Sequence, residues 1–183
     1  MLSARAFRAQ LVMLGQRELF DYWLRAADGR RMPARSDLDP LNVPRLLPHM
    51  GLIDLRTGPA EAAFRLAGTR LHEIYGQEIT GLRADDVFSG DAAPYWRRVH
   101  DRVAERGVTL HGVVKGPAQG RDHIVLFWLR LPLSEDGEQV DRILCYDVAA
   151  PMPELRAPAQ PSSLYRHRVR AQARPEQRRL QFG

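Results

Sequence analysis

The stretch of sequence that decides the fold begins at Ala62 and reads AAFRLAGTRLHEIYGQEITGLRADDVF through Phe88. It predicts a short apolar strand, a turn of small residues and brief helical pieces, because glycine favours the backbone conformations at which helices end. After a polar break, YWRRVHDRVAERG (residues 95–107) continues into VTLHG (108–112). This second segment predicts a longer amphipathic helix that stops at Gly107 and precedes a strand. The resulting order is strand, brief helices, long helix, strand.

The remaining strands follow from runs of apolar and β-branched residues. We expect five strands in all, at about residues 50–56, 62–67, 108–115, 121–132 and 139–148. Asp136-Gly137 predicts a hairpin between the last two strands, since this pair favours the turns that fit the twist of a hairpin. The Gly116–Gly120 segment similarly joins the third and fourth strands. The strand at 121–132 is apolar on both faces, so both faces of the sheet should be covered.

A helix near the N-terminus is predicted by apolar residues at positions i, i+3, i+4 and i+7, which are Phe20, Trp23, Leu24 and Ala27. Asp28-Gly29 ends this helix. The next segment, RRMPARSDLDPLNVPRLLPHM (residues 30–50), holds four prolines and therefore excludes a long helix. Asp39 can cap a single helical turn that has Pro40 at its first position.

This order of elements resembles a PAS domain, a small-molecule and signal-sensing module, over roughly Met50 to Ala149. The closing ILCYDV (residues 143–148) looks like the last strand of that family, which often ends in an aspartate followed by a β-branched residue. The segment before the first strand, with Met32–Arg35 and Asp37–Pro40, resembles the corresponding segment in a group of small bacterial single-PAS-domain proteins. The resemblance implies an α+β fold, with a five-stranded antiparallel sheet, short helices over one face and the N-terminal helix on the other.

Charge and proline content divide the chain into three parts. We expect an N-terminal helix and proline-rich lead-in at 1–48, a PAS-like domain at 49–150 and a disordered Arg/Pro-rich tail at 151–183. The tail holds seven arginines and two glutamates, and this excess equals the whole formal net charge of +5. Its prolines break helices and it offers few apolar residues to bury, a composition typical of disorder.

The geometry of the fold that the resemblance implies suggests a small pocket between the sheet and the 95–106 helix. The residues that we expect to line it and to bind a ligand are Trp96, Val99, His100, Val103, Leu126 and Trp128. Some PAS sensors hold haem through a histidine on this helix, which makes His100 a candidate ligand of iron. The alternative is a packed or solvated histidine at the edge of an apolar stripe. We leave the cofactor as unknown.

Flavin chemistry of the blue-light PAS type is excluded on residue placement. That chemistry needs a reactive cysteine in an asparagine-containing helical motif, whereas Cys145 lies on the last strand and Asn42 lies in the lead-in. A single cysteine also rules out a disulfide framework or a thiolate metal cage within one chain. Motifs for a serine nucleophile, a zinc protease or a phosphate-binding loop do not occur.

Other groups that could carry chemistry have ordinary explanations. Asp85-Asp86 are adjacent on a helical turn and diverge, so they favour solvated capping over a catalytic pair. His111 and His123 lie on neighbouring strands of one hairpin, but without a placed carboxylate they make a weak metal site. We therefore predict neither a metal site nor catalytic residues.

The function that we expect is that of a regulatory sensor or interaction module, which binds a small ligand or partner and signals through a separate effector or self-association. One alternative is a small cone-shaped α+β enzyme of the isomerase or dehydratase kind, in which His100 would work with Asp54 or Asp147. A second alternative is nucleic-acid binding through the basic tail, which the neutral body and the scarcity of aromatic residues in the tail disfavour.

Location and partners follow from composition. The longest unbroken apolar run, Ile124–Leu129, falls far short of the roughly 20 residues that span a membrane, so we expect a cytoplasmic protein. A signalling protein is the expected partner. The helix at roughly Leu11 to Ala27 has more apolar residues than one stripe needs, which predicts a homodimer contact. The alternative is that the proline-rich segment 33–48 folds back over the second face of the sheet.

Overall fold

One antiparallel sheet organises the chain in the computed structural model, which describes residues 3–88, 90–116 and 123–151. Its strands lie in the order β2-β1-β5-β4-β3. Their bounds are β1 Met50–Asp54, β2 Ala63–Ala67, β3 Leu110–Lys115, β4 Ile124–Leu133 and β5 Arg142–Pro151. Every pair of neighbouring strands is antiparallel. The five strands that the sequence predicted therefore all exist, with ends that differ by a few residues.

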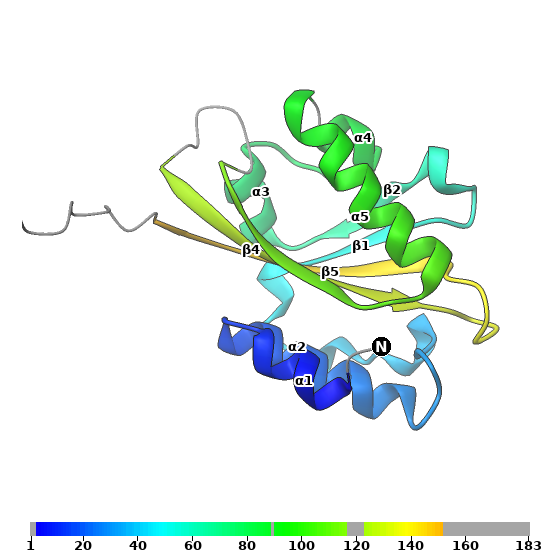
Figure 1. Cartoon of the computed structure of the whole chain (residues 1–183). Coiled ribbons are helices and arrows are strands. Elements are labelled where there is room, and N and C mark those ends of the chain that lie inside the picture. The colour runs from blue at the N-terminus through cyan, green and yellow to red at the C-terminus, as the bar shows by residue number, and fades with distance from the viewer. Residues whose placement is uncertain (1–2, 89, 117–122, 152–183) are drawn as a thin grey trace, which may run out of the picture. The chain divides into compact units, whose positions relative to one another are not determined.

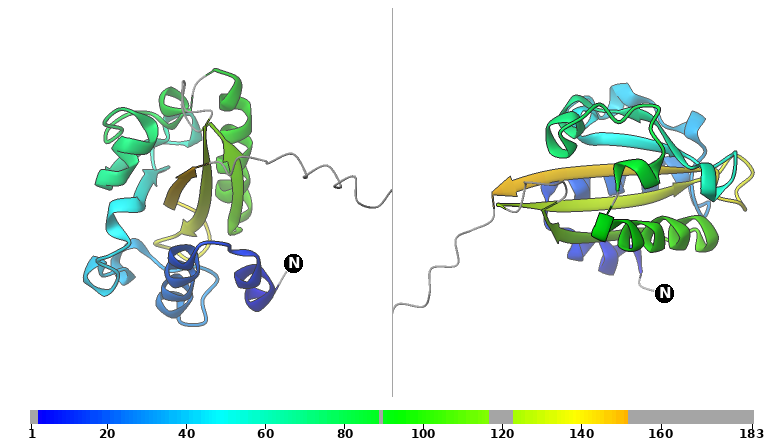
Figure 2. Two further views of the ribbon diagram at one scale, coloured as in Figure 1. Left: turned by 90° about the vertical axis from the view of Figure 1, so that its left-hand side faces the viewer. Right: turned by 90° about the horizontal axis from the view of Figure 1, so that it is seen from above.

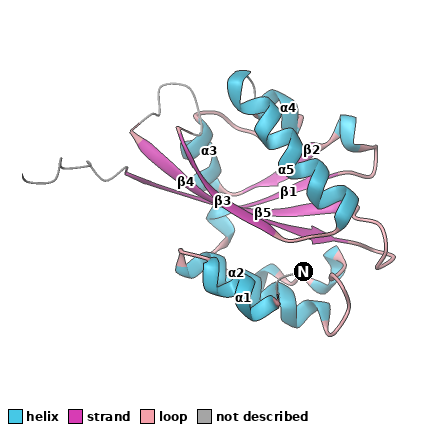
Figure 3. Cartoon of the chain, viewed as in Figure 1, coloured by secondary structure: helices cyan, strands magenta, loops and turns pink. Residues whose placement is uncertain are grey.

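Helices cover both faces of this sheet, as Figure 1 and Figure 2 show. The helices α1 and α2 lie against one face, and α3, α4 and α5 lie over the other. Their bounds are α1 Ala4–Gln10, α2 Leu14–Ala27, α3 Thr69–Tyr75, α4 Ala84–Val87 and α5 Ala93–Arg106. Figure 3 separates the helices, strands and loops by colour. This arrangement confirms the predicted fold class.

Short 3-10 turns replace longer helices where proline is frequent. They are η1 Arg35–Asp37, η2 Pro40–Asn42, η3 Leu47–His49, η4 Pro59–Glu61 and η5 Gly90–Ala92. The backbone N–H of Leu41 donates to Oδ1 of Asp39 at 2.9 Å, so η2 has the predicted cap with Pro40 at its first position. The α2 helix ends as expected, because Asp28 adopts a left-handed conformation at φ 45°.

The N-terminal region contains a helix that the sequence analysis missed. The helix predicted at roughly Leu11 to Ala27 corresponds to α2, which begins at Leu14. The α1 helix lies before the predicted range, and Leu11 follows its last turn in extended conformation. Its side chain is fully buried. Phe7 of α1 packs on Phe20 of α2, with ring centroids 4.9 Å apart, and on His111 of β3. The extended backbone at Leu11 separates α1 from α2 and thus lets both helices contribute to one core.

The two faces of the sheet have separate cores. We call the face under α1, α2 and the proline-rich lead-in the lead-in face, and the face under α3, α4 and α5 the sensor face. Successive residues of each strand point to opposite faces. Leu129 and Leu131 of β4 therefore join the lead-in core, whereas Leu126 and Trp128 join the sensor core. The lead-in core also takes residues from segment 33–48, namely Leu38, Val43 and Leu46.

Candidate functional site

The sensor core contains a buried ion pair between neighbouring strands. Nη1 of Arg130 on β4 donates to Oδ1 of Asp147 on β5 at 2.6 Å, and Nη2 donates to Oδ2 at 3.2 Å. Both side chains are completely buried. The hydroxyl of Tyr75, at the end of α3, donates to Oδ2 of the same carboxylate at 2.9 Å. Three elements thus meet at one charged centre, which has the two-point geometry that arginine and carboxylate favour.

His100 of α5 extends this centre toward the helices. Nε of Arg130 lies 3.4 Å from Nε2 of His100, an arrangement in which the guanidinium donates and the imidazole accepts. The guanidinium also stacks on aromatic rings, with its carbon 4.9 Å from the Trp96 ring centre and 5.8 Å from that of Trp128. We call Arg130, Asp147, Tyr75 and His100 the charged cluster. It lies within an otherwise aromatic and aliphatic core.

Burial and charge set the protonation of the charged cluster at neutral pH. Burial, and then the adjacent guanidinium, lower the pKa of His100 well below its ordinary value, so the imidazole is neutral. Burial lowers the pKa of Arg130, but the attraction of Asp147 outweighs it and leaves the pKa raised. Burial and Asp147 raise the pKa of Tyr75, which remains a hydrogen-bond donor. The cluster is therefore one cation and one anion joined to two neutral groups.

A surface cleft reaches the charged cluster at His100. The cleft has a volume of about 410 Å³ and lies between η4, α4 and α5. Two exposed ion pairs stand at its rim, Arg83 with Glu61 at 3.2 Å and Arg97 with Asp85 at 2.8 Å. Exposed pairs of this kind contribute little to stability. Of the four residues of the charged cluster, His100 is the one that lines this cleft, and it therefore connects the cleft to the buried ion pair.

The predicted pocket residues come together in the sensor core. Trp96, Val99, His100, Val103, Leu126 and Trp128 are all buried there. They fill the space between α5 and β4, and their binding of a ligand stays a prediction. Sequence reasoning missed the roles of Arg130 and Tyr75, and it considered Asp147 only as a strand marker and as a partner of His100. A signal existed for Arg130, because it interrupts the apolar run IVLFWLRL at a position on the same strand face as Trp128.

The residues present do not fit a haem group or a photoactive cysteine. The Nε2 atom of His100 that would bind iron faces Arg130, and the rings of Phe88 and Trp96 lie with centroids 5.4 Å and 5.9 Å from the imidazole. Burial raises the pKa of the Cys145 thiol to about 12, which opposes formation of a thiolate.

The other sequence candidates have structural roles. His111 of β3 pairs in register with Leu129, whereas His123 precedes the first residue of β4, so these histidines are not neighbours in the sheet. Asp85 forms its ion pair with Arg97 at the rim of the cleft. No group of three potential metal-binding side chains occurs among the described residues. None of the described helices is both long and apolar enough to cross a membrane.

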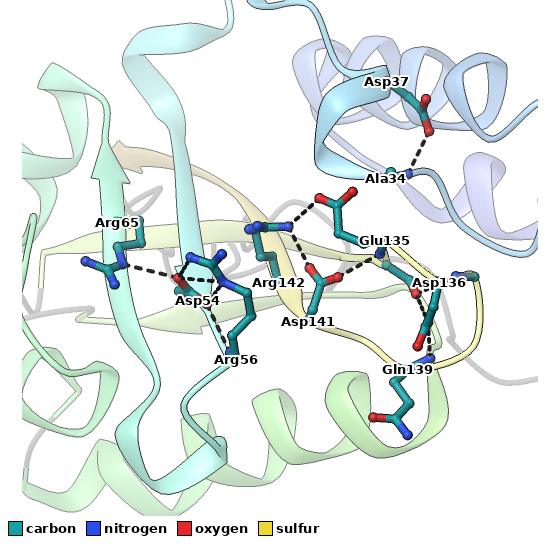
Figure 4. A network of polar contacts seen from close by, with 12 residues as sticks. Ala34, Asp37, Asp54, Arg56, Arg65, Glu135, Asp136, Gln139, Asp141 and Arg142 are labelled. Carbon is teal, nitrogen blue, oxygen red and sulfur yellow. Dashed lines mark hydrogen bonds and ion pairs between the residues drawn. The ribbon is translucent and has the colours of Figure 1, made fainter.

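Asp54 belongs to a different polar network, drawn in Figure 4. Its carboxylate lies between two arginines, with Nη2 of Arg56 at 2.7 Å and Nε of Arg65 at 3.2 Å. Hydrogen bonds from Arg56 are the largest cause that holds the pKa of Asp54 far below its ordinary value. The Asp54 carboxylate is therefore already bound by two arginines, and the catalytic pair with His100 that we considered is not formed. Figure 4 also shows a separate hydrogen bond in the β4–β5 turn, from the backbone N–H of Gln139 to Asp136.

No curated protein matches the chain. Among solved structures, a Rhodobacter sphaeroides LOV protein is similar at 16% identity and a TM-score of 0.46, over 61% of this chain and 68% of that one. A sensory box sensor histidine kinase from Vibrio cholerae is similar at 13% identity and a TM-score of 0.44, over 62% of this chain and 92% of that one.

A third solved structure, an RNA-binding Light-Oxygen-Voltage receptor, is similar at 16% identity and a TM-score of 0.44. The likeness covers 63% of this chain and 35% of the receptor. The family model described as "PAS domain" matches residues 13–146, which include α2, the lead-in and nearly the whole sheet. Because this match spans well over half of the 183 residues, the chain belongs to the PAS domain family.

Proposed function

We propose that the chain is a regulatory sensory module in which a small polar ligand acts on the charged cluster through the cleft at His100. The buried Arg130–Asp147 ion pair is the observation that carries the proposal. Apolar residues of similar volume are often as stabilising as a buried ion pair, so stability alone gives little reason to bury these charges. Perturbed ionisable groups beside a cleft are typical of functional sites. Membership in the PAS family, a family of sensory and typically non-enzymatic domains, supports this interpretation.

Contacts across the sheet give a ligand effect a physical route to the lead-in face. Nε2 of Gln16 on α2 donates to the backbone carbonyl of Trp128 at 3.1 Å. Nδ1 of His49 lies 3.0 Å from the backbone carbonyl of Asp147, so the lead-in also touches β5 beside the ion pair. A shift of the charged cluster would therefore move backbone groups that α2 and η3 hold. Such a shift acts by changing the populations of two arrangements.

The output of this module is a separate effector protein or a second copy of the chain. Two large apolar side chains are exposed where α1 connects to α2, Val12 at 61% and Leu14 at 79%. Most apolar residues of α2 are buried against the sheet, so the homodimer contact that we propose uses this short connection between α1 and α2. Light scattering of wild type and of Leu14→Asp checks it. A monomer at tens of micromolar protein would contradict the contact.

Native mass spectrometry of protein purified from the cells that produce it tests the ligand. The expected result is a bound mass of a few hundred daltons, reduced several-fold in His100→Gln. The matched control is His111→Gln, which changes a half-buried histidine of β3 that lies outside the cleft and should leave the bound mass in place. Equal retention by the two variants, or unliganded wild type, would contradict the proposal. An absorption spectrum of the same sample reports any coloured group.

A further inference from the structure

A second recess lies on the lead-in face, on the side of the sheet opposite the charged cluster. Its volume is about 230 Å³. Leu52 of β1, Leu66 of β2 and Leu144 of β5 line it from the sheet, and Leu38 and Val43 line it from the lead-in. We call this recess the lead-in groove. Apart from Tyr22 and Arg35, its lining residues are apolar and not aromatic, so a ligand there would gain affinity from burial of hydrocarbon.

One cation lies at the lead-in groove. Arg35 lines it, is half-buried, and uses Nη1 to donate to the backbone carbonyl of Leu38 at 3.0 Å. Among the ion pairs of the described residues, none includes Arg35. The two acids nearby in the sequence accept hydrogen bonds from other groups. Asp37 accepts from Arg30 at 2.6 Å and from the backbone N–H of Ala34 at 2.8 Å, and Asp39 accepts from the backbone N–H of Leu41 at 2.9 Å. The guanidinium is therefore available to an anion.

We infer that the lead-in groove binds a straight-chain aliphatic monocarboxylate, with the hydrocarbon between the leucines and the carboxylate on Arg35. An apolar recess with one charged group at its edge has the polarity of such a molecule, and arginine matches a carboxylate in two-point geometry. The recess is smaller than the roughly 300–1,000 Å³ of sites for drug-sized ligands. A single short acyl chain fits this size.

The site differs from the one proposed for the sensory function, and neither proposal depends on the other. The lead-in groove is open to solvent along Leu66, which is 54% exposed on the edge strand β2. Gly68 follows this strand, and a Cβ there would lie 2.1 Å from the carbonyl oxygen of Leu47. That close approach of two backbone segments fixes the end of the recess. The backbone at Gly68 thus forms part of the groove wall beside the aliphatic side chains.

Isothermal titration calorimetry with a series from hexanoate to dodecanoate, each below its micelle concentration, tests the inference. Affinity should rise roughly fourfold with each added methylene and then stop rising once the recess is full. Octanoate should bind at least about tenfold more tightly than 1-octanol, because the alcohol lacks the charge that pairs with Arg35. Arg35→Gln should bring the two affinities together, since it keeps a donor and removes the charge.

Two matched variants locate the site. Leu66→Asp places a negative charge on an exposed side chain at the groove and should weaken octanoate at least about tenfold. Val113→Asp makes the same change at a 52% exposed position on the other edge strand, outside the groove, and should leave binding unchanged. Absence of saturable binding, equal affinity for acid and alcohol, or equal effects of the two aspartates would overturn the inference.

Discussion

The two faces of the same sheet both carry an apolar core, but only one of them buries an ion pair among the described residues. On the lead-in face, β4 and β5 present Leu129, Leu131, Leu144 and Tyr146 to an apolar core. On the sensor face, the intervening positions of the same strands place Arg130 and Asp147 in full burial. Successive residues of a strand point to opposite faces, so the same two strands supply both sets of side chains. The comparison teaches that both faces carry an apolar core, and that the sensor face in addition keeps charges which stability does not require.

The largest expected effect is a loss of stability on the sensor face that a second substitution restores. Arg130→Met leaves a buried carboxylate without its cation and should lower the free energy of unfolding by about 3–5 kcal/mol. Arg130→Met/Asp147→Leu removes both charges and should recover most of this loss or exceed the stability of wild type. Urea denaturation measures both variants. A double variant as unstable as the single one would mean that the ion pair itself stabilises the fold.

The matched pair on the lead-in face should behave in the opposite way. Leu131 and Leu144 are partners in the β4–β5 register. Leu131→Ala should cost about 2–5 kcal/mol, because it removes buried hydrocarbon and leaves a cavity. Adding Leu144→Ala should enlarge the loss rather than relieve it. Recovery of stability in this double variant would remove the distinction between the two faces.

Two tryptophans offer a smaller contrast. Nε1 of Trp23, on the lead-in face, donates to the backbone carbonyl of Pro132 at 2.9 Å. Nε1 of Trp128, on the sensor face, is buried and has no hydrogen-bond partner among the described residues. Trp23→Phe should therefore cost about 1–3 kcal/mol more than Trp128→Phe, since only the first leaves a buried carbonyl without its donor. Thermal unfolding of the two variants checks this, and equal losses would contradict it.

The fold was predictable because its signals are local. Helical periodicity identified Trp96, Val99 and Val103 on one face of α5, and strand runs located the sheet. The charged cluster joins four elements, and only their three-dimensional arrangement shows that Arg130 meets both Asp147 and His100. The α1 helix also escaped prediction, because Phe7 is its single large apolar residue and it therefore shows no apolar periodicity. Proline-rich backbone has no periodic pattern, so the lead-in groove could not be seen from sequence.

The pH dependence of stability should report the neutral state of His100. The pKa of His100 is lower in the folded state than in the unfolded state. Below about pH 6.5 the unfolded state therefore binds a proton that the folded state does not bind. The contribution of His100 to stability is therefore complete above this pH and decreases as pH falls below about 6.5, by at most about 1.4 kcal/mol per unit. The pKa of Asp54 is also depressed, but its effect belongs to more acidic conditions.

Urea denaturation of His100→Gln across pH 5 to 7 measures this contribution. The variant should show a flatter acid limb than wild type. Burial also lowers the pKa of His111, though less completely, so His111→Gln should flatten the limb to a smaller extent. An acid limb that His100→Gln leaves unchanged would show that the imidazole is already protonated in the folded state.

The smallest expected effect concerns the tail, most of which lies outside the described residues. A chain that ends at Pro151 retains β5 in full and should melt within about a degree of the full-length protein, because the prolines and arginines beyond it offer little to bury. Salt-sensitive binding to acidic partners should decrease in the shortened chain. A loss of several degrees in Tm would contradict the prediction of a disordered tail.

The most direct test of the central claim is the fraction of protein that carries a small molecule when Arg130→Met/Asp147→Leu and wild type are purified from the same cells. Native mass spectrometry measures this fraction, and Leu131→Ala is the control for a change of stability on the opposite face. We predict that wild type and Leu131→Ala carry the ligand and that the stable double variant does not. Equal ligand occupancy in the double variant and wild type would contradict the claim that the buried charges serve sensing.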